Sequence, residues 1–475
     1  MAGSGAAESA APSRWGESQR FVPTKVVQPI QRLLALETAG GIAMLVAAVV
    51  ALVWANSPWH ESYFTLWETP FELAFGESGP FHIHLTLQEF VNDILMALFF
   101  YLAALEIKHE LVHGSFQDKR AAALPALAAL GGMVVPALVY FALNAGGEAS
   151  GGWGIPMATD IAFAVSVVTL LGKRVPLAAR AFLLTLAVAD DIGGIVVIAI
   201  FYTEGLKFAW LAGAIVAFAL SYYAQRLEIR SYAPYLIAGV AAWFCLHESG
   251  VHATIAGVVL GLLTPANPFY SVHHFTNRAQ PLVDRIAENM ADHHVTDEEA
   301  VSNDTSLRDL ARLSVETLSP LERHLAWAGP WVAFVIVPIF ALANAGVRVV
   351  GGGFGNPLTD VVVLGPALGL LIGKTVGIFT ASFIAVKAKI GKLPEGVTWP
   401  MVGGLATIGG VGFTVALFIT SLAFDDPDIT DRAKLGVLIG SLVSGAVGYV
   451  VLRIAAGKNA AAGNPSGRLP EGATV

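Results

Sequence analysis

The sequence predicts an all-helical membrane protein that crosses the bilayer many times. Of its 475 residues, 55% are hydrophobic and only 13% are charged, whereas soluble domains contain about 25% charged residues. Apolar stretches of about 20 residues recur along the chain, and a helix of this length crosses a hydrocarbon core of about 30 Å. Runs of alanine, leucine and valine with interspersed glycine favour helices over the alternating strands of a membrane β-barrel.

About twelve transmembrane helices are predicted, within a transmembrane domain that covers residues 34–456. Charge-free apolar stretches run from Thr38 to Trp59 and from Ala121 to Gly147, at the first and third predicted helices. The predicted spans are residues 34–57, 87–111, 121–145, 153–172, 176–202, 208–225, 232–248, 249–265, 324–349, 361–387, 400–423 and 434–455.

The distribution of positive charge supports this count, because cytoplasmic loops of membrane proteins are enriched in Lys and Arg. With a cytoplasmic N-terminus, most of the 28 Lys and Arg residues fall on the cytoplasmic side. The positive residues in the predicted outside loops are Lys207, Arg348, Arg432 and Lys434. The pattern predicts an even number of spans with both termini in the cytoplasm.

Three segments lie outside the apolar spans. The N-terminal extension, residues 1–33, lacks an apolar signal-peptide core and is expected to be flexible and cytoplasmic. The tail, residues 457–475, is expected to be disordered. The cytoplasmic loop 266–323 is polar and acidic, so we expect a solvated, partly disordered segment. Its paired histidines match no closed metal site in their spacing. They are His273, His274, His293 and His294.

Charged residues inside the predicted spans carry the functional argument. Asp160 lies in the fourth span, Asp190 and Asp191 lie in the fifth, and Lys374 lies in the tenth, while Asp93 lies near the start of the second. Each Asp or Lys at mid-bilayer costs about 2.5–3.5 kcal/mol on insertion scales. A buried salt bridge between Lys374 and one carboxylate is the structural alternative, but it accounts for only two of these charges.

The adjacent pair Asp190–Asp191 predicts a site that holds either protons or a cation. Neighbouring residues on a helix point about 100° apart, so the two carboxylates should differ in role. One can face a polar cavity, and the other can pair with Lys374. Two nearby carboxylates cannot both ionise cheaply in a low dielectric. Competition between H⁺ and a cation for the same oxygens amounts to cation/proton exchange, and hard oxygen ligands such as these and Thr159 suit Na⁺ or Li⁺.

Two of the predicted helices look interrupted. The fourth carries Pro156 followed by Thr159 and Asp160, and the eleventh carries glycines at 403–404, 409–410 and 412. These are the middle members of helices 3–5 and 10–12, and paired breaks in matching places indicate an inverted-repeat transporter. Asp160 and Lys374 have the charges needed to compensate the facing half-helix ends.

Several segments of the chain, in order, form a family pattern. They are Leu105–Lys108, Met157–Ala164, Ala189–Gly193, Ser249–Thr254, Ala343–Gly346, Gly373–Lys374, Gly412–Thr414 and Ser421–Phe424. The chain thereby resembles the NhaA family of bacterial sodium/proton antiporters from about residue 35 to residue 455. That family is itself a known case of inverted repeats.

The resemblance implies roles for individual residues. Asp191 matches the main cation-binding carboxylate, and Asp190 matches its partner, which can pair with Lys374. Thr159 and Asp160 match the crossing of the two unwound helices at mid-membrane, and Asp93 matches an acidic residue near the cation path. Positions linked to the pH response are matched by Glu106, Glu110, His252 and Glu322.

The resemblance also implies an activity and a setting. Family members export one Na⁺ or Li⁺ for two H⁺ across the bacterial inner membrane, which is electrogenic and serves sodium and pH homeostasis. They need no cofactor, contact membrane lipid and often form homodimers, so a homodimer is expected here. The chain departs from the family pattern at His109, Thr375 and Gly410, which leaves the aspartates and Lys374 intact and bears on the pH set point. Glu106 and Glu110 also fit a plain interfacial charge cluster.

Other function classes fit less well. A net charge of -8 offers no basic surface for nucleic acid, and the single Cys245 allows no internal disulfide. An intramembrane aspartyl protease would show a Gly-x-Gly-Asp run, which precedes none of the intramembrane aspartates. A cation channel would conduct without proton coupling, a sensor would bind Na⁺ without turnover, and an organic-anion carrier would more often lack the Asp pair. The sequence therefore predicts a secondary transporter and not an enzyme.

Overall fold

A computed structural model describes residues 38–74, 82–203, 205–229, 232–291, 297–349 and 356–461. The predicted N-terminal extension lies outside these residues. The predicted disordered tail lies outside them from residue 462 onward, and residues 457–461 instead continue the last helix.

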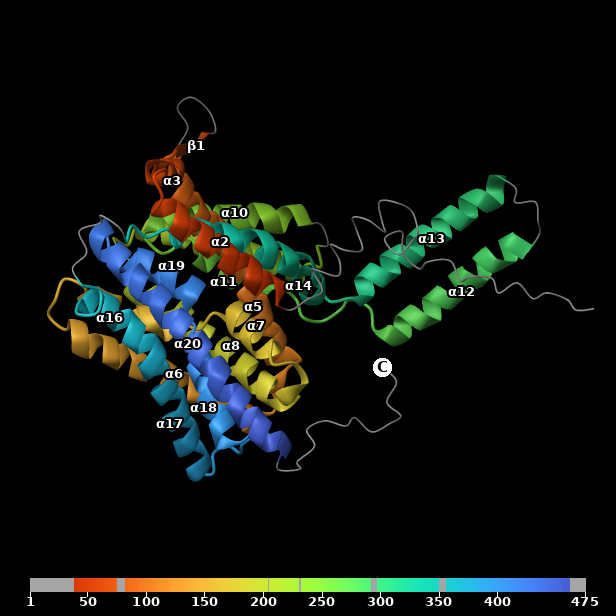
Figure 1. The fold of residues 1–475 in the computed structure, drawn as a ribbon. Coiled ribbons are helices and arrows are strands. Elements are labelled where there is room, and N and C mark those ends of the chain that lie inside the picture. The colour runs from red at the N-terminus through yellow and green to blue at the C-terminus, as the bar shows by residue number, and fades with distance from the viewer. Residues whose placement is uncertain are drawn as a thin grey trace, which may run out of the picture.

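Helices dominate the first half of the described chain (Figure 1). Its elements are α2 (Ala39–Ala55), α3 (His60–Glu68), β1 (Pro70–Ala74), β2 (His82–Thr86), α4 (Leu87–Glu89), η3 (Phe90–Leu95), α5 (Met96–Val112), η4 (Ser115–Gln117), α6 (Lys119–Asn144), η5 (Ser150–Met157), α7 (Ile161–Thr169), η6 (Gly172–Arg174), α8 (Leu177–Phe201), α9 (Phe208–Arg226), α10 (Tyr232–Ser249) and α11 (Ile255–Leu263).

The second half repeats the alternation of long and broken helices. Its elements are α12 (Val272–Ala291), α13 (Asp297–Thr317), α14 (Pro320–Trp331), η7 (Val332–Ile336), α15 (Val337–Asn344), α16 (Val361–Leu368), η8 (Gly369–Gly373), α17 (Lys374–Lys387), α18 (Trp399–Ile408), α19 (Phe413–Ala423) and α20 (Pro427–Ala461).

The protein is an all-helical polytopic membrane protein, as predicted. Among the described residues, seven continuous helices are long and apolar enough to cross a membrane, and up to ten are if each bent helix pair counts as one span. Every predicted span overlaps a helix or a helix pair of the structure. The spans predicted at 232–248 and 249–265 overlap α10 and α11, which fall outside those ten.

Two features near the start of the chain were not predicted. Helix α3 turns away from α2 by 114°, and strands β1 and β2 form an antiparallel pair in which Phe71 lies opposite Leu85. Both follow from the end of the first apolar stretch at Trp59, beyond which the sequence alternates polar and apolar residues over lengths too short to span a bilayer.

The expectation of a partly disordered loop at 266–323 is wrong for most of that segment. The described part forms two helices, α12 and α13, which pack against each other and stand away from the rest of the molecule (Figure 1). Apolar residues recur at helical spacing within the polar sequence, so each helix has a stripe to bury against the other. Ala279 and Leu313 are the buried apolar residues of this pair.

Close packing of α6 against α17 buries Lys374 inside the helix bundle. A Cβ atom on Gly377 would overlap the carbonyl of Gly131, and one on Gly373 would lie 2.6 Å from the Cα atom of Pro136. Glycines at four-residue spacing therefore let the two backbones approach. Three π-helical turns also interrupt long helices, η3 at Asp93, η7 within the ninth span and η8 immediately before Lys374.

Candidate ion-exchange site

The fourth and eleventh spans are both broken, as predicted, and their breaks meet. Elements η5 and α7 bend by 40° across residues 158–160, and α18 and α19 bend by 46° across residues 409–412. The backbone N–H of Asp160 donates to the carbonyl of Val411 at 2.7 Å. Gly412 permits this approach, because a Cβ atom there would lie 3.0 Å from the carbonyl of Ala158.

The Asp160 carboxylate caps both half-helices that begin at the breaks. Its Oδ1 accepts from the backbone N–H of Phe163 at 2.9 Å, in the first turn of α7. Its Oδ2 accepts from the backbone N–H and the hydroxyl of Thr414, at 3.1 and 2.7 Å, in the first turn of α19. A buried negative charge therefore faces two helix N-termini, where helix dipoles favour an anion.

Lys374 contacts the first of the paired aspartates. Its ammonium forms an ion pair with Asp190 Oδ2, and both side chains are 0% exposed. The same ammonium donates to the Thr159 hydroxyl at 2.9 Å. That hydroxyl lies 2.7 Å from Asp190 Oδ2 and 2.8 Å from the carbonyl oxygen of Gly409, so its single proton serves one of these two acceptors. Thr159 thus joins the Asp pair to both broken helices.

Asp191 has no ammonium partner in the part of the chain that the structure describes. Its Oδ1 is buried and accepts no hydrogen bond from a described residue, and the same is true of Asp190 Oδ1. Asp190, Asp160 and Glu106 are near enough to repel a charge on Asp191, and Lys374 attracts it. Buried carboxylate oxygens without donors are costly unless a proton or a cation occupies them. The cluster therefore has spare oxygen ligands and too little positive charge.

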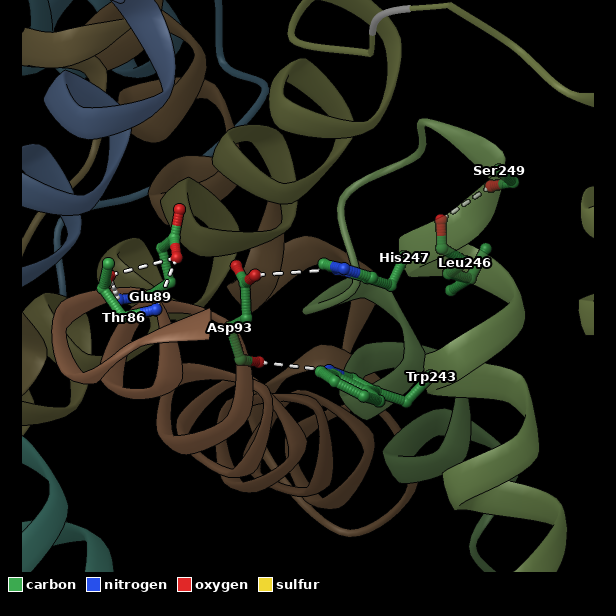
Figure 2. A network of polar contacts seen from close by, with 7 residues as sticks. All are labelled: Thr86, Glu89, Asp93, Trp243, Leu246, His247 and Ser249. Carbon is green, nitrogen blue, oxygen red and sulfur yellow. Dashed lines mark hydrogen bonds and ion pairs between the residues drawn. The ribbon is translucent and has the colours of Figure 1, made fainter. Parts of the chain in front are cut away.

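Asp93 belongs to a separate polar network. It lies in the π-helical turn η3, where Trp243 Nε1 of α10 donates to its backbone carbonyl at 3.3 Å (Figure 2). His247 Nδ1 lies 3.7 Å from Asp93 Oδ2, and its ring stacks on that of Trp243 with centroids 5.6 Å apart. One turn earlier, Glu89 forms a capping box with Thr86. Two aromatic side chains of α10 thus hold this turn.

Comparison with known proteins decides the family. The sequence profile described as Na⁺/H⁺ antiporter 1 matches residues 31–452. A relative named Na(+)/H(+) antiporter NhaA, from Helicobacter pylori, is 44% identical over 89% of this chain and 94% of its own. Another of that name, from Rhodopirellula baltica, is 42% identical over 90% of this chain and 94% of its own.

The chain belongs to the Na⁺/H⁺ antiporter 1 family. Its resemblance to the NhaA antiporters is thereby confirmed. Among solved structures, the sodium proton antiporter MjNhaP1 from Methanocaldococcus jannaschii aligns with a TM-score of 0.49 and 12% identity, covering 91% of this chain and 98% of that chain.

The four residues matched to the family's pH response fall into three separate places. Glu106 and Glu110 are one turn apart on α5, and Glu106 is the one near Asp191. The His252 ring packs edge-on against Phe418 at 5.8 Å. Glu322 caps α14, where its carboxylate accepts from the backbone N–H of Ser319 at 3.4 Å. Glu322 therefore has a structural task at a helix start.

Two contributors to the central cluster and one to the Asp93 network were not predicted. Thr414 and Gly409 supply a hydroxyl and a carbonyl to the central cluster, and His247 faces Asp93. Thr414 stands in the quoted Gly412–Thr414 segment, so its hydroxyl in the first turn after a break was the available signal. No sequence signal pointed to His247. A histidine within an apolar helix is ordinarily interpreted as a core residue unless the residues of the facing helix are known.

Proposed function

We propose that this antiporter-family protein exports Na⁺ or Li⁺ in exchange for H⁺ across the inner (cytoplasmic) membrane, using Asp190 and Asp191 as the shared binding groups. The single observation that carries the proposal is the imbalance of the buried cluster. Two adjacent carboxylates face one ammonium, and two of their oxygens accept no hydrogen bond from described residues. A cation or protons satisfy these oxygens, and the two cannot do so together.

The chemistry of exchange follows from this competition. In the proton-loaded form Asp190 and Asp191 each carry a proton. Release of both protons leaves two carboxylates, Lys374 pairs with Asp190, and Na⁺ binds at Asp191, the next residue; the Thr159 hydroxyl contacts Asp190 and the Gly409 carbonyl. Asp160 keeps the helix starts in place while the ions change, because its oxygens are already committed to Phe163 and Thr414.

Export against a sodium gradient requires a driving force. Two protons entering for each Na⁺ that leaves would move one net charge inward, and the membrane potential contributes about 2.3 kcal/mol per charge per 100 mV. The positive-inside pattern supports cytoplasmic termini. Protons therefore enter toward the side of the membrane on which both termini lie. No resident cofactor takes part, and Na⁺, Li⁺ and H⁺ are cargo. This activity serves sodium and pH homeostasis.

Regulation by pH is part of the same proposal. Glu106 lies near Asp191 and one turn from Glu110, so a change of charge on this face of α5 reaches the site electrostatically. His252, between α10 and α11, contacts Phe418 of α19 and links its own charge to the broken helix. Glu322 contributes through the start of α14.

Proton flux in proteoliposomes tests the proposal. We expect addition of Na⁺ or Li⁺, but not K⁺, to release protons between pH 6.5 and 9, and we expect Asp191→Asn to abolish the release. Asp431→Asn, an acidic residue on α20, is the matched control and should retain exchange. Flux without proton movement would assign a channel, and unchanged exchange in Asp191→Asn would overturn the assignment of the pair.

A further inference from the structure

Two histidines lie one helical turn apart at the end of α5. His109 is in the last turn of the helix and His113 follows it as the C-cap, four residues later. Side chains at this spacing are neighbours on one face of a helix. With Glu110 between them, they form the pattern His-Glu-x-x-His, in which two helical histidines of a metalloprotease bind zinc. The pattern therefore raises the question of a metal site outside the ion-exchange cluster.

The two imidazole rings are spaced as a shared metal ion requires. Their centroids are 5.5 Å apart, and their planes are inclined by 45°. Imidazole nitrogens bind Zn²⁺ at about 2.0–2.1 Å, so two rings on one tetrahedral ion have centroids about 5 Å apart. Among the described residues, neither ring forms a hydrogen bond or an ion pair. The His113 side chain is exposed and that of His109 is partly exposed, so an ion in solution can reach both.

The charges around the histidines favour a bound cation. The C-terminal end of a helix carries a partial negative charge, and both histidines lie at the end of α5. The adjacent Lys108 points to α11, where its ammonium donates to the carbonyl of Leu262 at 2.6 Å. Glu110 lies between the two histidines in the sequence and adds a carboxylate to the same end of the helix. A metal ion here thus lies near a carboxylate, while the neighbouring ammonium is held elsewhere.

The same face of α5 leads from the histidines to the ion-exchange site. Glu106 precedes His113 by seven residues, which is about two turns, or about 10 Å along the helix axis. The two positions differ by only about 20° around the helix, so they share one face. Glu106 is also near enough to Asp191 to repel a charge on it. A dication on the histidines therefore lies about two turns from the carboxylate that borders the Asp pair.

Two protein ligands make an open binding site and not a catalytic centre. Catalytic zinc sites have three protein ligands, and structural zinc sites have four. Within the described part of the chain, no group of three His, Cys, Asp or Glu side chains is placed to hold a metal ion. The Glu110 carboxylate lies instead against Gly114, where a Cβ atom would be 2.2 Å from its Oε2. Water would complete the shell of an ion on His109 and His113.

Imidazole ligands select transition metals over the ions that this family exchanges. Neutral imidazole suits Zn²⁺, Ni²⁺ and Cu²⁺, whereas hard cations such as Na⁺ take oxygen ligands. We propose that His109 and His113 together bind a divalent transition metal ion, and that the bound ion inhibits exchange by opposing the approach of Na⁺ to Asp191. Two added positive charges on this face of α5 repel a second cation. The inhibition rests on the proposed function, whereas the binding does not.

Cu²⁺ binding to the full-length protein, purified without a polyhistidine tag, tests the site. Electron paramagnetic resonance resolves the coupling of Cu²⁺ to imidazole nitrogen. We expect two imidazoles on the tightest-bound ion in the wild type, and fewer in His109→Gln and in His113→Gln. In equilibrium dialysis, the tightest Zn²⁺ should bind at least about tenfold more weakly to either variant.

His273→Gln combined with His274→Gln is the matched control for binding. These two residues are adjacent on α12, so their side chains point about 100° apart and do not converge on one ion. The control should keep the wild-type spectrum and Zn²⁺ affinity. A wild-type spectrum with a single imidazole, or a two-imidazole spectrum that persists in His109→Gln, would overturn the proposal.

Na⁺-driven proton release in proteoliposomes tests the inhibition. With Zn²⁺ on both sides of the membrane, the KM for Na⁺ should rise about threefold at low ionic strength and less in added salt, with kcat unchanged. EDTA should reverse the rise, and neither His109→Gln nor His113→Gln should show it. An unchanged KM in the Zn²⁺-loaded wild type would overturn the inhibition. A wild type without exchange in the absence of metal would contradict the proposed function instead, and the binding result would stand.

Discussion

The Lys374 ammonium contacts the Asp190 carboxylate inside the helix bundle, and neither side chain has exposed surface. The contact joins α17 to α8, and Thr159 links the same ammonium to the break in the fourth span. Asp191, the next residue, is left without an ammonium among the described residues. One cation thus neutralises one of two adjacent carboxylates, which gives the pair unequal roles.

Removing the Lys374 ammonium alone should lower the stability of the fold more than removing the charges of both Lys374 and Asp190. Lys374→Met leaves Asp190 buried and unpaired, and breaking a buried pair from one side costs about 3–5 kcal/mol. We expect a clearly lower thermal unfolding temperature in detergent, followed by intrinsic fluorescence. Asp190→Asn combined with Lys374→Met should recover most of the loss, because no unpaired charge remains.

Lys387→Met serves as the control for this series. Lys387 lies on the same helix and is exposed, with its ammonium 5.7 Å from the centroid of the Phe383 ring, so its loss should change the unfolding temperature little. The interpretation fails if Lys374→Met unfolds like the wild type, or if the double variant is as unstable as Lys374→Met alone.

Asp160 should matter to the stability of two helices at once. Asp160→Ala leaves the N–H groups of Phe163 and Thr414 without their acceptor, and each lost cap costs about 1 kcal/mol, with more for a buried donor. Asp160→Asn keeps a single carbonyl acceptor and should fall between alanine and the wild type. Unfolding temperatures of purified variants, together with Na⁺-driven proton release, give this order.

A single-helix cap provides the comparison for Asp160. Asp360 caps α16 alone, accepting from the N–H of Val362 at 2.9 Å, and also pairs with Arg432. Asp360→Asn should therefore have the smaller effect on both measurements. If Asp360→Asn proves as damaging as Asp160→Asn, the double cap does not explain the sensitivity of Asp160.

Local sequence was sufficient for the spans and the breaks, and insufficient for the contacts between them. The length of an apolar stretch sets whether it can cross a bilayer, so the spans follow from composition alone. Pro156 and the glycines at 409–412 disturb the helix at their own positions. That Asp160 reaches Thr414 depends on how two helices cross, and no residue spacing encodes that angle.

For the 266–323 segment the prediction of local structure itself was wrong. Its acidic composition predicted a disordered loop, since charge and low hydrophobicity oppose collapse. The buried residues Ser306 and Leu313 of α13 are nevertheless seven residues, or about two helical turns, apart, and Ala279 is buried on α12. Composition averages over a window and misses such a stripe, whereas periodicity detects it.

His247 should set how readily a cation reaches Asp93. Its Nδ1 lies 3.7 Å from the Asp93 carboxylate, so a protonated imidazole competes with Na⁺ for that carboxylate. His247→Gln keeps a polar side chain without the charge, and we expect a lower KM for Na⁺ with kcat unchanged. Partly exposed ion pairs contribute about 0.2–1 kcal/mol, so the change in KM should be up to about fivefold.

Asp93→Asn should raise KM, because it removes the charge that attracts the cation, and adding His247→Gln to it should change nothing further. Trp243→Phe is the matched variant on α10, since it removes the indole donor to the Asp93 carbonyl and keeps an aromatic ring beside His247. If His247→Gln lowers KM equally in the Asp93→Asn background, the histidine acts by another route than Asp93.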